Sequence, residues 1–153
     1  MLAEILFYDV VLAVHVIAIV IAFGGTFMYP VLGPFLGKNH PGALPAFHEA
    51  QDRIGKVLIT PFAVLALISG IYLAADRDLF GEVWVQVPMG ILIVLLGMGG
   101  AVFSPLERKA AVAASNPEGA EYQALVKRSA QMGTLAGVLI LVAIFFMVAK
   151  PGA

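Results

Sequence analysis

Four evenly spaced apolar runs of about 20 residues each constrain the fold more than any other feature of the sequence. At about 1.5 Å of rise per residue, a helix of this length crosses the roughly 30 Å hydrocarbon core of a bilayer. A soluble domain of 153 residues, 61% of them hydrophobic, could not bury so much apolar surface. The runs lie at residues 10–29, 57–75, 83–104 and 130–149.

The runs predict an all-α fold. Lipid permits only helices and closed barrels, because every backbone N–H and C=O must find its partner within the protein. The period-two alternation that marks a barrel strand is absent from the runs. We therefore expect a polytopic membrane four-helix bundle, in which residues 1–153 form a single transmembrane domain.

Lysine and arginine concentrate in the two longer connections between the runs. The positive-inside rule places these connections in the cytoplasm and both termini outside. We expect a multi-pass protein of the bacterial cytoplasmic (inner) membrane. Of the 9 basic residues, seven lie in the two connections: Lys38, Arg53, Lys56, Arg108, Lys109, Lys127 and Arg128.

Composition excludes several classes of function. The chain has no cysteine, which rules out disulfides, thiolate metal sites and thiol catalysis. A net charge of −1 without a dense basic stretch argues against a nucleic-acid partner. The partner that the composition predicts is the lipid bilayer itself.

The two halves of the chain resemble each other, which suggests a tandem duplication of a transmembrane hairpin. The pattern Gly-Gly-x4-Pro occurs at residues 24–30 and again at 99–105, an offset of 75. The second and fourth runs align at an offset of 74, with Thr60 matching Thr134. A duplication predicts that the two hairpins are related by an axis along the membrane normal.

Small residues recur at helical spacing in the third and fourth runs, at Gly90, Gly97 and Gly100 and at Gly133 and Gly137. Small residues let membrane helices approach closely, because lipid supplies no hydrophobic force for their association. We expect these faces to pack within the bundle. They also suit self-association or association with other membrane subunits.

His15 is the only histidine within the apolar runs, and an ionisable residue at such a position is a candidate functional residue. Neutral imidazole is a good ligand for haem iron, and a methionine thioether can complete the pair. The alternative is a structural hydrogen bond to a neighbouring helix, for which Gln86 and Tyr72 lie at a suitable depth. His40 and His48 fall in the first long connection, where we expect solvent-exposed loop residues.

Several of these residues together resemble a family. The chain is similar to the small bacterial membrane proteins around the haem-b protoporphyrinogen oxidase and the copper-resistance D proteins, and most of all to an uncharacterised group of four-helix membrane proteins. The resemblance implies haem b, with His15 as its metal ligand. Met89, Gln86 and Tyr72 lie at a similar depth to His15 in the predicted bundle, and we expect them as further cofactor-binding residues. Its matching residues are His15, Gly25, Pro30, Arg53, Pro61, Gly70, Tyr72, Leu73 and Trp84.

The chain departs from the oxidase at residues that matter for its chemistry. Ala22 stands where the oxidase has tryptophan, Val31 where it has a basic residue, and Gln86 and Pro88 where it has histidine and lysine. Without the basic residues, the substrate carboxylates would lack partners. Two functions therefore stay open, with the question of enzymatic activity: an oxidoreductase-like haem or redox role, alone or in a membrane redox complex, and a non-enzymatic membrane component, either an accessory subunit or a small transporter-like bundle.

Overall fold

The computed structural model describes residues 2–152, with side chains from Phe7 onward, and it confirms the all-α four-helix prediction. Within these residues four helical spans are long and apolar enough to cross a membrane, so the chain is a multi-pass helical membrane protein. Each span contains one of the apolar runs. The spans are Phe7–Asn39, Pro41–Asp76, Val83–Ala113 and Ala120–Ala149.

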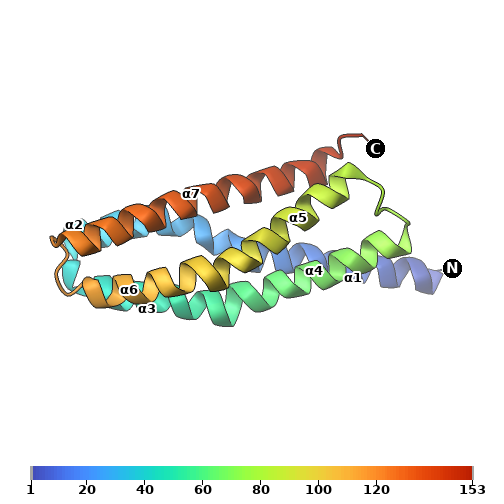
Figure 1. Ribbon diagram of the computed structural model, residues 1–153. Coiled ribbons are helices and arrows are strands. Elements are labelled where there is room, and N and C mark those ends of the chain that lie inside the picture. Colours follow the sequence, from blue (N-terminus) through green and yellow to red (C-terminus); the bar gives the residue numbers. More distant parts are fainter. Residues whose placement is uncertain (1, 153) are drawn as a thin grey trace.

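The spans form an elongated up-and-down bundle (Figure 1). Both termini and the α4–α5 turn lie at one end, here called the terminal end. The short helices α2, α3 and α6 and the start of α7 lie at the other, here called the basic end because it carries the seven basic residues of the two connections. The α-helices are α1 (Leu2–Phe23), α2 (Tyr29–Asn39), α3 (Leu44–Ile54), α4 (Thr60–Asp76), α5 (Val83–Met98), α6 (Ser104–Ala113) and α7 (Ala120–Ala149).

The two long connections are largely helical, which the sequence did not predict. Only the segment around His40, with the 3-10 turn η2 (Pro41–Ala43), and residues 114–119 interrupt the helices at the basic end. The helices therefore continue beyond the apolar runs. They build a polar extension of the bundle, in which α3 packs against α6 and α6 against α7.

Three of the four spans depart from α-helical geometry just before a proline. The residues before Pro30 form a 3-10 turn, η1 (Gly24–Met28), and those before Pro61 and Pro105 form π turns. Proline lacks the N–H that would bond four residues back, and its ring clashes with that carbonyl, so the preceding turn must tighten or widen. The π turns are η3 (Gly55–Ile59) and η4 (Gly99–Phe103).

The core within the apolar runs is built mainly from alanine. Ala18 and Ala22 of α1 meet Ala63 and Ala66 of α4, and all four are almost completely buried. Small side chains allow these helices to pack closely, and α1 with α4 is the most extensive helix pair. The buried cluster also contains Phe23, Leu92 from α5 and Ile140 from α7.

Most glycines at these positions of the second hairpin do not pack within the bundle, which corrects the expectation from their spacing. Gly90, Gly97 and Gly100 are exposed, and no other part of the protein lies within 4 Å of a methyl group built on them. Gly133 is equally open, while Gly137 meets only the ring of Phe27, at 3.7 Å. The stripe of small residues on α5 therefore faces the surroundings of the bundle.

Two cations cover aromatic rings at the terminal end. The guanidinium of Arg77 lies 4.2 Å from the ring centre of Tyr8, and the ammonium of Lys150 lies 4.9 Å from that of Trp84. Such contacts join an amphipathic ring to a cation at the membrane boundary. They tie the start of α1 to the end of α4, and the start of α5 to the end of α7.

The proposed duplication stays a prediction. Both Gly-Gly-x4-Pro segments interrupt their helices, as the shared spacing suggests, but the first forms a 3-10 turn and the second a π turn. The same motif thus marks the same place in each hairpin with a different local geometry.

Candidate functional site

His15 lies between α1 and α4 with 8% of its surface exposed, which confirms that it faces the bundle interior. Its Nδ1 is 2.8 Å from the carbonyl oxygen of Ala66 and 3.1 Å from the hydroxyl of Ser69. A carbonyl can only accept, so Nδ1 carries the proton and donates it to Ala66. Nε2 is left with a lone pair and with no hydrogen-bond partner among the described residues.

Ser69 and Gly70 shape the surface on which the imidazole lies. The Ser69 hydroxyl donates to the carbonyl of Leu65 one turn earlier, and so presents a lone pair to His15. A methyl group on Gly70 would come within 3.0 Å of Cε1 of His15, closer than carbon atoms pack. Glycine at this position therefore lets the ring lie directly against α4.

The three residues predicted to bind a cofactor together with His15 have other contacts in the structure. Gln86 is exposed, and its amide donates to the carbonyl of Phe80 at 2.7 Å. The ring of Tyr72 packs edge-on against Phe7, with centroids 5.5 Å apart. Met89 is half-buried on α5, a helix that packs mainly on α7 and α4 rather than α1. Their role as cofactor-binding residues stays a prediction.

A second polar site, missed by the sequence analysis, lies at the basic end. The prediction of a solvent-exposed loop was wrong for His48, which lies on α3 and is only 4% exposed. Its Nδ1 donates to the carboxylate of Glu107 on α6 at 2.6 Å, and its Nε2 is 3.0 Å from the hydroxyl of Tyr122 on α7. Ser129 donates to the other carboxylate oxygen at 2.6 Å. His40, by contrast, is exposed as predicted.

This site, here called the His48 cluster, joins three helices through side chains whose hydrogen bonds are all satisfied. Glu107 is as buried as His48, and its two oxygens accept one hydrogen bond each. Buried polar groups of this kind stabilise a fold only when all are paired. Leu44, Ala114 and Tyr122 form a buried apolar cluster beside these polar groups. Together they hold α3, α6 and α7 in contact at the basic end.

A helical pattern in the connections could have revealed the His48 cluster. Leu44 and His48 are four residues apart and share a helix face, and Tyr122 and Ser129 are seven apart. On α6, Glu107 lies among buried residues at helical spacing: Leu106, Ala110, Ala111 and Ala114. The pattern is short and contains charged residues, so its apolar content alone does not distinguish it from a loop.

Neither histidine lies in a metal-binding group. Among the side chains described, those of residues 7–152, no three histidine, cysteine or acidic groups converge in a way that could hold a metal ion. At the His48 cluster both ring nitrogens are already in hydrogen bonds. Of the two buried histidines, only His15 keeps a ring nitrogen, Nε2, without a hydrogen bond, and a single such atom does not make a protein-built metal centre.

No protein-family model, curated protein or solved structure matches this chain. The resemblance to the haem-b oxidase and copper-resistance D proteins therefore stays a prediction that rests on its motif residues. Gly70 is the one motif residue to which the structure gives a direct role beside His15.

Proposed function

We propose that the protein is a non-enzymatic component of a membrane assembly, which binds a transmembrane helix of a partner along the small-residue stripe of α5. The observation that carries this proposal is the contrast between small residues in the two hairpins. The alanines between α1 and α4 are buried against a neighbour, whereas Gly90, Gly97 and Gly100 have none within 4 Å of an added methyl group.

The second hairpin is also less covered than the first, mainly because of α7. In the most apolar window of each span, 22% of Phe7–Asn39 and 28% of Pro41–Asp76 is buried, against 22% of Val83–Ala113 and 11% of Ala120–Ala149. Glycine weakens a helix unless its lack of a side chain serves a close approach. In a membrane, such an approach lets backbones meet and supplies the van der Waals contact that drives helix association.

Photo-crosslinking tests this proposal in intact cells. Position 94 would carry p-benzoylphenylalanine, because Val94 is an exposed large side chain of α5 beside the stripe, so the glycines themselves stay unchanged. The matched control is position 68, where Ile68 is exposed on α4. We expect a discrete adduct from position 94, identified by mass spectrometry as a second copy or another membrane subunit. Gly97→Ile should abolish it, because a branched side chain on the stripe blocks the approach. Equal adducts from positions 94 and 68, or none from 94, would reject the proposal.

A second candidate function is haem b binding through His15, and the hydrogen bond to Ala66 favours it. Histidines that ligate metals commonly donate their other ring proton to a backbone carbonyl, which fixes the tautomer. His15 has this arrangement, with Nδ1 engaged and Nε2 free. A bound haem would supply one-electron chemistry. The role of the protein's residues is to orient the imidazole through Ala66, Ser69 and Gly70.

The visible spectrum of the detergent-purified protein tests the second candidate. Haem bound at His15 predicts a Soret band that His15→Ala removes while the helical circular dichroism is kept. A spectrum without a Soret band, after expression with haem supplied, would leave His15 with its structural role alone.

The orientation that the basic residues predict completes the proposal, with the basic end in the cytoplasm and both termini outside. Because the chain has no cysteine, a single Asn116→Cys between α6 and α7 gives a clean label. We expect an impermeant thiol reagent to miss it in intact cells and to label it after permeabilisation. Labelling in intact cells would reverse the assignment.

A further inference from the structure

A surface groove of about 430 Å³ lies between α6 and the start of α7. It is lined by Pro105, Arg108, Lys109 and Val112 of α6 and by Glu121 of α7. Arg108 and Lys109 are both exposed, and neither forms an ion pair with the side chains of residues 7–152. The groove thus offers two free cations beside an apolar wall.

The nearest carboxylates do not cancel this charge. Glu107 precedes Arg108 in the sequence but is turned inward, where His48 and Ser129 occupy its oxygens. Asp52 of α3 is close enough to interact electrostatically with Arg108, but its oxygens pair with Lys56 and accept a hydrogen bond from the hydroxyl of Ser104. Glu121 alone faces the groove, which leaves it with a net charge of +1 from its lining residues.

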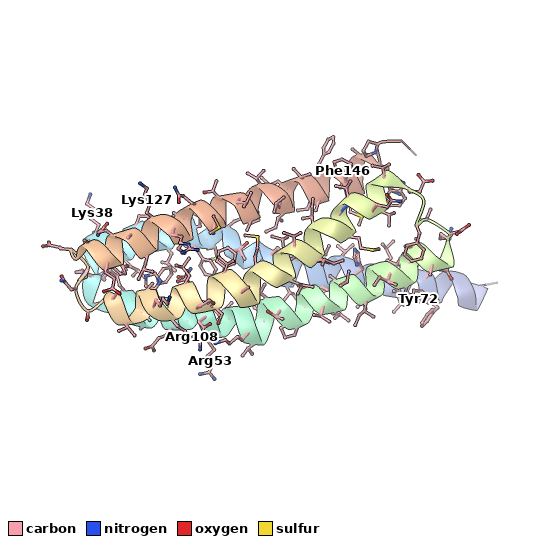
Figure 2. All side chains as sticks on the ribbon, viewed as in Figure 1. Lys38, Arg53, Tyr72, Arg108, Lys127 and Phe146 are labelled. Atoms are coloured by element: carbon pink, nitrogen blue, oxygen red, sulfur yellow. The ribbon has the colours of Figure 1, made fainter. Side chains whose placement is uncertain are left out.

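The groove begins where the hydrocarbon ends. The third apolar run closes at Ser104, so Arg108 lies roughly 6 Å further along the helix. The headgroup layer on one side of a bilayer is roughly 5–8 Å thick. Arg108 and Lys109 are therefore at headgroup depth. Figure 2 shows the labelled basic side chains Lys38, Arg53, Arg108 and Lys127 all in this half of the bundle.

We propose that the groove binds the headgroup of an anionic phospholipid, with Arg108 and Lys109 on its phosphate. The guanidinium can donate two parallel hydrogen bonds to phosphate oxygens, and the ammonium adds a mobile charge. Pro105, on the hydrocarbon side of Arg108, contacts the apolar part of the lipid below the phosphate, while the exposed Val112 lies about one turn further out, beside the headgroup. The acyl chains then continue along the apolar surface of the bundle.

Native mass spectrometry of the full chain, released from mixed phosphatidylglycerol and phosphatidylcholine micelles, tests this assignment. The wild type should retain phosphatidylglycerol in preference to phosphatidylcholine. The double variant R108Q/K109Q should lose that preference by about tenfold or more, because each basic residue at an anionic surface contributes roughly a factor of five. The matched control K127Q/R128Q removes the same charge from exposed residues of α7 outside the groove, and should retain the preference.

The outcomes separate the groove from its alternatives. An equal loss in K127Q/R128Q would show a diffuse basic belt and overturn the site. Displacement of the lipid by glycerol phosphate at the same concentration would show a soluble anion as the ligand and overturn the lipid assignment. Unchanged melting temperatures in both variants serve as the folding control. A failed crosslink at position 94 would leave this test unaffected, because the two surfaces share no residue.

Discussion

The two buried histidines both need hydrogen-bond partners for their ring nitrogens, and they find them in different groups. His15 lies in an apolar run and satisfies its ring proton with a backbone carbonyl and a serine hydroxyl of the neighbouring helix. His48 lies in the polar extension and binds a carboxylate and a phenol from two other helices. Where lipid surrounds the bundle, the partner is a neutral group of α4; at the basic end, where water is close, it is an ionisable side chain.

The comparison predicts that replacing His48 lowers the stability of the fold more than replacing His15. When His15 is removed, its partner Ser69 still donates a hydrogen bond to the carbonyl of Leu65. When His48 is removed, Glu107 keeps only the hydrogen bond from Ser129, because its two oxygens accept from His48 and Ser129 alone. The unpaired carboxylate left behind by a substitution at His48 should therefore outweigh the empty space left at His15.

The largest expected effect follows from His48→Ala. It leaves the buried carboxylate of Glu107 without its main donor, and we expect a loss of about 3 kcal/mol in the free energy of unfolding. Unfolding in sodium dodecyl sulfate, followed by circular dichroism, measures it. His40→Ala is the control, since its exposed ring should change stability by less than about 0.5 kcal/mol. If His48→Ala lowers the free energy of unfolding no more than His40→Ala does, the His48 cluster does not stabilise the basic end.

A smaller effect is expected from Gly70→Ala, which places a methyl group 3.0 Å from the His15 ring. Overpacking of this kind costs roughly 1–3 kcal/mol. The cost should vanish when His15 is also replaced by alanine, because the clash is with that ring, and a double-mutant cycle measures this coupling. Gly97→Ala has open space around it and should be neutral or stabilising. If Gly70→Ala stays costly without the His15 ring, the ring does not set the requirement for glycine.

His15→Ala should cost about 1–2 kcal/mol, less than His48→Ala in the same detergent assay. Only neutral groups lose a partner, and the space left lies beside alanines that are already packed. His15→Asn keeps a donor but shortens it, and should recover part of the loss. If His15→Ala proves more costly than His48→Ala, the unequal cost argued from the two environments is wrong.

The smallest predicted effect separates the two oxygens of Glu107. Ser129→Ala leaves Oε1 without a donor while His48 still holds Oε2, and we expect a loss of about 1 kcal/mol. Ser115→Ala is its control, because that exposed hydroxyl bonds only to its own helix, at Val112. Equal melting temperatures for the two variants would mean that water replaces Ser129.

The spans were predictable from the sequence because lipid leaves the chain little choice. Any run of 20 apolar residues must form a helix in a bilayer, whatever its neighbours are. The interior position of His15 followed from the same constraint. Its actual partner did not, since a backbone carbonyl carries no sequence signature and becomes an acceptor for His15 only because Gly70 clears the way.

The basic end was predicted less well because its helices lie outside the apolar runs, where lipid does not force the chain to be helical. Residues 44–54 and 104–113 are short, amphipathic and rich in charge, so tertiary contacts rather than lipid decide that they are helical. The His48 cluster depends on register between three such helices. No spacing within one segment specifies that His48 meets Glu107, 59 residues further on.

The helix interruptions have a mechanical consequence. Gly99 of η4 lies next to Thr60, the residue that follows η3, at 4.0 Å for an added methyl group, and η3 packs against α1. The first span is interrupted as well, at η1, whereas α7 continues as an unbroken helix over 30 residues. Helices bend where their ladder of i→i−4 hydrogen bonds is disturbed. We therefore expect bending of the bundle to occur at the interrupted turns of the first three spans, and α7 to connect the basic end to the apolar half without such a joint.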